Sequence, residues 1–129
     1  MRCLVITGVA RRTLDELLRR VVRTLELRSA HNVATALKAN VGDLVFLTSS
    51  RLDDLGRGTT GLIAEVVGKE VISHSLVFAS DTMLQECEMT VVRLKLNVRG
   101  MGRIAKLHST GILDKTEADV VEMSYFDAR

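Results

Sequence analysis

The sequence VVRTLELRS places charged and hydroxyl side chains inside a run that is otherwise apolar and favours β-structure. In a strand, Leu25 and Leu27 share one face. Thr24, Glu26 and Arg28 share the opposite face. A carboxylate on such a face can accept hydrogen bonds from a nucleobase, and a neighbouring arginine can hold that carboxylate or bind a phosphate through paired NH groups. Glu26 is therefore the candidate for base recognition, with Arg28 as its charged neighbour.

Arg23 and Ser29 border these residues and complete a candidate ligand-binding group of Arg23, Thr24, Glu26, Arg28 and Ser29. Strict alternation places Arg23 on the same strand face as Leu25 and Leu27. Its side chain can therefore reach the face of Glu26 only if a β-bulge or a position at the strand edge redirects it. A purely structural interpretation stays open beside the ligand site. Glu26 and Arg28 can form an ion pair, which contributes about 0–1 kcal/mol when it is exposed.

Positive charge is concentrated in two segments, although the net charge is only +2. Residues 1–28 contain seven arginines and three acidic residues, and residues 93–106 contain five basic residues and no acid. If the two segments meet in space, the protein has a basic face. Charges on separate faces are the alternative. The candidates for contacts with a nucleic-acid backbone are Arg57, Arg93, Lys95 and Arg99.

Length and composition indicate one soluble globular domain over residues 1–129, with 47% hydrophobic and 26% charged residues. The longest apolar runs are too short to cross a bilayer, and the N-terminal residues lack the small-residue cleavage site of a signal peptide. We therefore expect a cytoplasmic protein that does not enter a membrane. Cys3 and Cys87 are far apart in the sequence, and we expect both to be reduced.

Alternating apolar and polar residues predict a chain composed mainly of strands. The clearest alternation is TVVRLKLNV, in which Val92, Leu94 and Leu96 face one way and Arg93 and Lys95 the other. The expected strands are residues 2–8, 21–29, 43–48, 61–67, 71–79, 90–98, 103–109 and 118–126.

Two short helices are expected between the early strands. Residues 11–20 have leucines at helical spacing, and Thr13 and Glu16 match a capping box. Residues 31–40 carry a second helical pattern that ends before Gly42. Many short strands with two early helices predict a mixed α/β, mainly β protein whose sheet forms a closed or nearly closed β-barrel.

Three connections are predicted from polar residues and glycines. Residues 50–60 are the best candidate for a mobile loop. Residues 80–88 are expected to form a helical turn or an irregular crossover. Gly100 and Gly102 are expected to supply a turn that lets residues 103–109 pair with the strand before them.

A strand, a short helix and a strand with the pattern GxKxxExR resemble the start of ASCH domains, which are small β-barrels of the PUA-like superfamily. The corresponding positions here are Val21, Arg23, Glu26 and Arg28. Glu26 and Arg28 match the pattern, Arg23 replaces a lysine, and the leading glycine is missing. The resemblance covers about the first half of the chain.

The next segment is also similar to that family, because Gly42 and Asp43 precede the hydrophobic LVFLTSS. The resemblance implies a PUA-like barrel that binds RNA or a nucleotide-like ligand in a cleft lined by Thr24, Glu26 and Arg28. The whole chain also resembles a small, uncharacterised archaeal family. Two alternatives stay open: a small hydrolase that acts on a nucleoside or RNA with Glu26 as general base, and a protein-interaction domain without a small ligand.

GRGTTG, residues 56–61, matches the glycine pattern of dinucleotide-binding proteins. In those proteins the pattern follows a strand directly and opens a helix, whereas here it follows SSRLDDL and precedes the β-favouring GLIAEVV. We therefore expect a hairpin or loop and no cofactor.

The histidines His31, His74 and His108 lack the spacing of metal ligands, so no metal site is expected. His31 follows Ser29 closely. It is either an ordinary residue at the start of a helix or an acid or base in the same cleft.

Overall fold

The computed structural model describes residues 1–79, 83–109 and 115–123. Strands account for most of these residues, which confirms the expected mainly β composition with two helices. In chain order the elements are β1 (Arg2–Ile6), α1 (Arg11–Leu18), β2 (Thr24–Leu27), α2 (Ala30–Leu37), β3 (Leu44–Leu47), the 3₁₀ helix η1 (Leu52–Asp54), β4 (Thr60–Ala79), β5 (Leu84–Ser109) and β6 (Glu117–Glu122).

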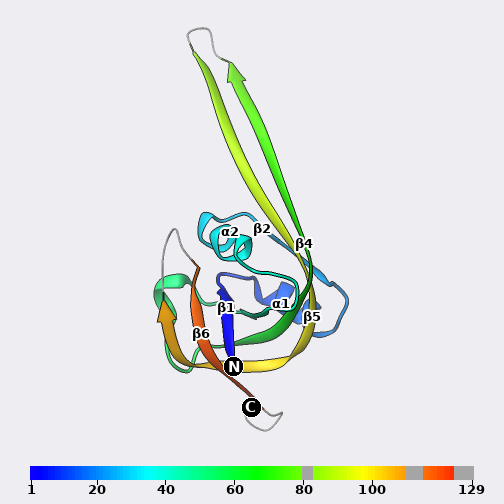
Figure 1. Ribbon diagram of the computed structural model, residues 1–129, viewed down its shortest axis with the longest axis vertical. Helices are drawn as coiled ribbons and strands as arrows, with labels where there is room; N and C mark the ends of the chain where they lie inside the picture. Colours follow the sequence, from blue (N-terminus) through cyan, green and yellow to red (C-terminus); the bar gives the residue numbers. More distant parts are fainter. Residues whose placement is uncertain (80–82, 110–114, 124–129) are drawn as a thin grey trace.

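The strands form one sheet in the order β2-β5-β4-β3-β1-β6. An additional pairing of β5 with β6 closes β5, β4, β3, β1 and β6 into a ring and leaves β2 at an edge. Neighbouring strands are antiparallel except β1 and β3, which are parallel. Figure 1 shows the ring curving around the lower part of the molecule, with both helices beside it.

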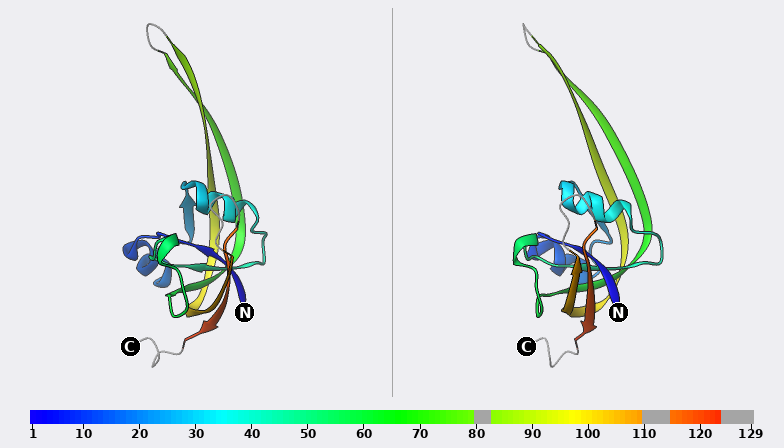
Figure 2. Two further views of the ribbon diagram at one scale, coloured as in Figure 1. Left: turned by 90° about the vertical axis from the view of Figure 1, so that its left-hand side faces the viewer. Right: turned by 60° about the vertical axis from the view of Figure 1, so that its left-hand side comes forward.

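The longest elements, β4 and β5, stay paired from Thr60 opposite Arg103 to Ala79 opposite Leu84. Their inner parts belong to the ring. Their outer parts, residues 72–79 and 84–91, form a two-stranded ribbon that we call the arm. Figures 1 and 2 show the arm projecting far beyond the rest of the molecule in every view. The expected crossover at 80–88 is therefore wrong for residues 84–88, which are part of β5; residues 80–82 lie outside the described residues.

The predicted turn at Gly100 and Gly102 is also wrong, because β5 runs through both residues without reversing. Space explains the second glycine. A Cβ at Gly102 would lie 2.6 Å from Cδ1 of Ile63 and 2.8 Å from Cγ1 of Val120, which belong to the two flanking strands. The glycine therefore allows close side-chain packing across the ring and does not mark a turn.

Both helices form where they were expected, but the predicted capping box of α1 is wrong. Helix α1 begins at Arg11, its N-cap is Ala10, and no side chain caps it, so Thr13 already lies inside the first turn. Helix α2 begins after Ser29, whose hydroxyl accepts a hydrogen bond from the backbone NH of Asn32. Ser29 thus has the hydrogen bond that stabilises a helix start.

The predicted alternation of β2 and β5 is confirmed. Leu25 and Leu27 are buried on β2, whereas Thr24 and Glu26 are exposed. These leucines belong to a core cluster between the sheet and the two helices, which also includes Leu17, Val33, Ala36, Val66, Val92, Leu94 and Leu96. The inward leucines of β2 hold the outward Glu26 at a fixed place on the sheet.

Cys3 is buried and free, as expected, and burial raises the pKa of its thiol to about 11. The side chain of Cys87 lies outside the described part of the structure. Among the described helices, none is both long and apolar enough to cross a membrane.

Candidate functional site

The two basic segments of the sequence meet because β2 pairs with β5. The register sets Thr24 opposite Lys95 and Glu26 opposite Arg93. Several of the positive charges have acidic partners at this surface: Arg93 lies 3.7 Å from Glu26, and Arg99 lies 2.9 Å from Glu65. Pairing therefore leaves only part of the positive charge free for a ligand.

Glu26 lies between two arginines. Its Oε1 is 3.3 Å from Nη2 of Arg28 and 3.7 Å from Nε of Arg93. The side chain of Glu26 is 36% exposed, that of Arg28 is 66% exposed and that of Arg93 is 45% exposed. Exposed ion pairs of this kind contribute about 0–1 kcal/mol, so Arg28 can leave Glu26 at little cost. Arg93 then still holds the carboxylate.

Three of the predicted ligand-binding residues, Glu26, Arg28 and Ser29, line a cleft of about 450 Å³, which we call the β2 cleft. It lies where the end of β1, the starts of both helices, β2 and the segment before η1 come together. Its polar lining residues are Thr7, Thr13, Glu26, Arg28, Ser29, Asn32 and Arg51.

Asn32 holds the start of α2 against the end of β1. Its Oδ1 accepts a hydrogen bond from the Thr7 backbone NH at 3.0 Å, and its Nδ2 donates to the Thr7 carbonyl at 2.8 Å. The two bonds imitate the pairing of a strand, so they fix one wall of the cleft. Thr13 of α1 and the N-cap residue Ala10 line the cleft beside this wall, and no side chain caps α1. The first NH groups of a helix favour an anion nearby.

Arg23 does not share the β2 cleft. It precedes β2 at the opposite end and lines a different cavity of about 300 Å³, together with Arg20, Lys95 and Asn97. We call this second space the bulge cavity, because Val67, the extra residue at a register shift of β4, also lines it. Thr24 lies between the two ends, exposed on β2. The predicted ligand-binding group is thus divided along the strand.

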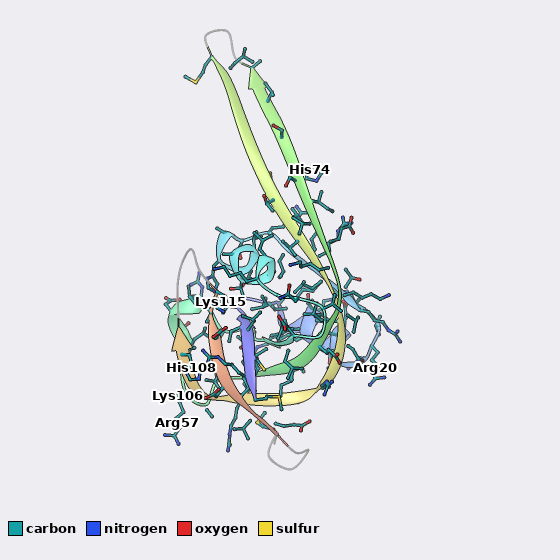
Figure 3. All side chains as sticks on the ribbon, viewed as in Figure 1. Arg20, Arg57, His74, Lys106, His108 and Lys115 are labelled. Carbon is teal, nitrogen blue, oxygen red and sulfur yellow. The ribbon has the colours of Figure 1, made fainter. Side chains whose placement is uncertain are left out.

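The predicted backbone-contact group is divided as well. Arg93, Lys95 and Arg99 lie on the exposed face of β5. Arg57 instead lines a third cavity, beside Arg103. Figure 3 shows Arg57 and Arg20 on opposite sides of the molecule, so Arg57 lies away from the bulge cavity.

The glycine motif has the predicted setting, because it follows η1 and a short connection and leads into β4, not into a helix. Within the predicted loop, residues 52–54 form η1. His31 faces another part of the molecule: its Nε2 is 3.2 Å from the hydroxyl of Thr116, and it is not among the residues that line the β2 cleft. Across residues 1–79, 83–109 and 115–123, no three His, Cys, Asp or Glu side chains gather as a metal site would require.

Two carboxyl groups with shifted pKa values lie on β6, away from the cleft. Hydrogen bonds from Lys115 and Arg2 lower the pKa of Glu117, and a hydrogen bond from His108 lowers the pKa of Asp119. Arg2 Nε donates to Glu117 at 2.9 Å, and His108 Nε2 lies 2.8 Å from Asp119. These pairs join β6 to its neighbours in the ring.

Sequence reasoning missed Arg51, Asn32, Thr7 and Thr13 as lining residues. Asn32 could have been found from the sequence, because it lies three residues after Ser29, the N-cap of α2, and therefore at the start of that helix beside the cleft. Arg51 follows a segment that is held beside the end of β1, because the backbone NH groups of Gly8 and Val9 donate to the carbonyls of Ser50 and Thr48. The alternation of β2 gave no information on these contacts.

Fold and site together define a mainly β protein with a ring-closed sheet and a polar cleft beside its edge strand. The family described as "Protein of unknown function (DUF473)" matches residues 1–118, and the chain belongs to that family. An uncharacterised protein of Methanocaldococcus jannaschii is 24% identical over 102 residues. The match covers 79% of this chain and 64% of that relative, which fits the expected resemblance to an uncharacterised archaeal family. No solved structure matches significantly.

Proposed function

We propose that the protein is a cytoplasmic, PUA-like domain that binds RNA or a nucleotide-like ligand in the β2 cleft. The order β1-α1-β2 supports the ASCH-like assignment, since Glu26 on β2 and Arg28 directly after it occupy the positions of the GxKxxExR pattern. The Gly42-Asp43 turn before β3 and the closure of the sheet are further points of similarity.

One observation carries the proposal: a carboxylate, two guanidinium groups and two helix starts converge on one cleft. Glu26 supplies the carboxylate and Arg28 and Arg51 the positive charges. A volume of about 450 Å³ lies within the range of roughly 300–1,000 Å³ that small-molecule sites occupy. The cleft therefore has the size and the groups for one nucleotide.

Each group has a distinct role in the proposed complex. Arg28 and Arg51, with the first NH groups of α1, bind the phosphate. Glu26 accepts hydrogen bonds from the base edge. Arg28 exchanges its partner from Glu26 to the phosphate, while Arg93 keeps Glu26 in place. Stacking contributes little, since the chain has only three phenylalanines and one tyrosine.

Binding of the four nucleoside monophosphates, measured by calorimetric titration, tests the proposal. Arg28→Ala is expected to weaken the binding of all four ligands by about 10- to 100-fold, because a charge-assisted hydrogen bond contributes roughly 1.5–3 kcal/mol. Glu26→Gln is expected to change the order of preference among the bases, since an amide presents a donor where the carboxylate presents only acceptors.

Lys106→Ala is the control variant, because it removes one positive charge from an exposed site on β5 that is not part of the cleft. Thermal melting shows whether each variant is folded. The proposal is wrong if the wild-type protein binds no nucleotide. It is also wrong if Arg28→Ala and Glu26→Gln bind all four ligands as the wild-type protein does.

A further inference from the structure

The bulge cavity is formed by two local irregularities of the chain. After α1, Arg20 adopts a left-handed conformation with φ 60°, and the backbone NH groups of Val21 and Val22 turn back to the carbonyl of Glu16. This reversal brings Arg20 and Arg23 to one side of the cavity. On the other side, β4 shifts register between Val66 and Gly68.

The register shift makes room for Lys95. Gly68 is its partner across the sheet, and a Cβ at Gly68 would already lie 3.3 Å from Cβ of Lys95. Val67, the unpaired residue of the bulge, forms part of the apolar floor together with Leu96. Bulges commonly redirect side chains next to binding sites.

The charge of the cavity is uncompensated. Arg20, Arg23 and Lys95 line it with the amide of Asn97, and no acidic residue belongs to the lining. Among the described residues, none of these three cations has an ion-pair partner within 4.0 Å, whereas Arg28 and Arg99 each have one and Arg93 has two. Three positive charges in one space repel each other, and an anion relieves that repulsion.

The position of the cavity relative to the β2 cleft limits the kind of anion. Arg23 precedes β2 and Arg28 follows it, so their backbones are roughly 17 Å apart at a rise of about 3.3 Å per residue. A single strand of about three to six nucleotides spans that distance, because stacked nucleotides rise about 3.4 Å each and an unstacked strand extends further. Lys95 and Arg93 are exposed along the path between the two ends.

We infer that the bulge cavity is a second phosphate site, which takes the far end of a single-stranded RNA whose first nucleotide lies in the β2 cleft. This inference rests on the proposed function and adds the class and the length of the ligand. The apolar floor of Val67 and Leu96 lies beside a sugar or base, while Arg20, Arg23 and Lys95 bind the phosphate.

The test compares one mononucleotide with unstructured RNAs of two to six nucleotides at low salt. Wild-type affinity is expected to rise about 10-fold once the strand reaches the bulge cavity, in keeping with one or two added phosphate contacts. The double variant Arg23→Ala/Lys95→Ala is expected to lose this gain and to bind the mononucleotide unchanged. Both residues are exposed, so we expect the variant to fold, and thermal melting checks this.

A matched control removes two positive charges elsewhere on β5. Arg103→Ala/Lys106→Ala is expected to keep the gain with length, and Figure 3 shows Lys106 on the side of the molecule opposite Arg20. A gain that persists in Arg23→Ala/Lys95→Ala, or that disappears equally in the control, overturns the inference. Equal affinity of the wild-type protein for the mononucleotide and for longer RNA also overturns the inference. The proposed function still stands in that case. A wild-type protein that binds neither ligand overturns both.

Discussion

At the scale of single residues, the fold explains two of the glycines in GRGTTG, one by close packing and one by its backbone conformation. A Cβ at Gly61 would collide with the backbone carbonyl of Leu47 and lie 2.9 Å from Cζ of Phe46. Gly58 has φ 92°, which a residue with a side chain rarely adopts. Gly56 has open space around it and no positive φ. Two of the three glycines in the motif are therefore required by the fold.

We predict that Gly61→Ala lowers the free energy of unfolding by about 1–3 kcal/mol, the usual cost of inserting a methyl group into a packed interior. The carbonyl of Leu47 belongs to β3 and cannot move without disturbing the ring. Gly56→Ala is the matched control and is expected to change stability by less than about 0.5 kcal/mol. Urea denaturation measures both. Equal stability of the two variants would contradict the close approach of β4 to β3.

The alternation of β2 predicted which of its residues face outward, because Leu25 and Leu27 must be buried and their neighbours follow from the strand period. The same alternation placed Arg23 on the strand face opposite Glu26. In the structure Arg23 indeed does not reach the β2 cleft, because it lies at the other end of β2. Parity along one strand cannot predict the residues that reach the cleft from elsewhere in the chain. Arg51 was missed for that reason.

At the scale of elements, the arm is the main departure from expectation. Its two strands continue beyond the ring, and no third strand in the described part of the chain pairs with them. Val77, Met83 and Leu84 are exposed near its tip. The sequence of residues 80–88 mixes polar and apolar types without a clear period, so it did not predict pairing. A turn was predicted at Gly100 and Gly102 because glycine is common in turns. In the structure, close contacts with the two neighbouring strands explain Gly102.

The base of the arm is tied to α2. Nζ of Lys69 donates hydrogen bonds to the carbonyls of Leu37 at 3.0 Å and Ala39 at 2.7 Å, which closes the end of that helix. Among the described residues, neither core cluster includes one between positions 67 and 91. Beyond Ile72 and Val91, the described side chains of the arm therefore contribute little to the core.

We predict that the ring folds without the arm. Replacing residues 73–90 by Asn-Gly joins Ile72 to Val91, which are partners in the register, through a short hairpin turn. The melting temperature is expected to change by less than about 5 °C, equivalent to roughly 1 kcal/mol in a domain of this size. Loss of a cooperative melting transition would show instead that the arm is needed for folding.

At the scale of the whole molecule, charge separates the arm from the ring. Residues 71–92 contain three acidic residues and no lysine or arginine, so the arm is unsuited to a nucleic-acid backbone. The ring and its helices carry the basic residues, partly paired as at Arg99 and Glu65 and partly unpaired as in the bulge cavity. The shortened variant is therefore expected to bind nucleotides as the full chain does.

Binding of a nucleotide in the β2 cleft is tested most directly by amide NMR of the ¹⁵N-labelled protein during titration with a nucleoside monophosphate. We predict that the largest shift changes occur at residues 7–13, 25–32 and 51–52, which form the cleft, its immediate surroundings and the first turn of α1. Amides of the arm and of β6 are expected to stay nearly constant. Absence of shift changes at saturating nucleotide, or changes confined to the arm, to β6 or to the Arg57 cavity, would show that no nucleotide binds in the β2 cleft.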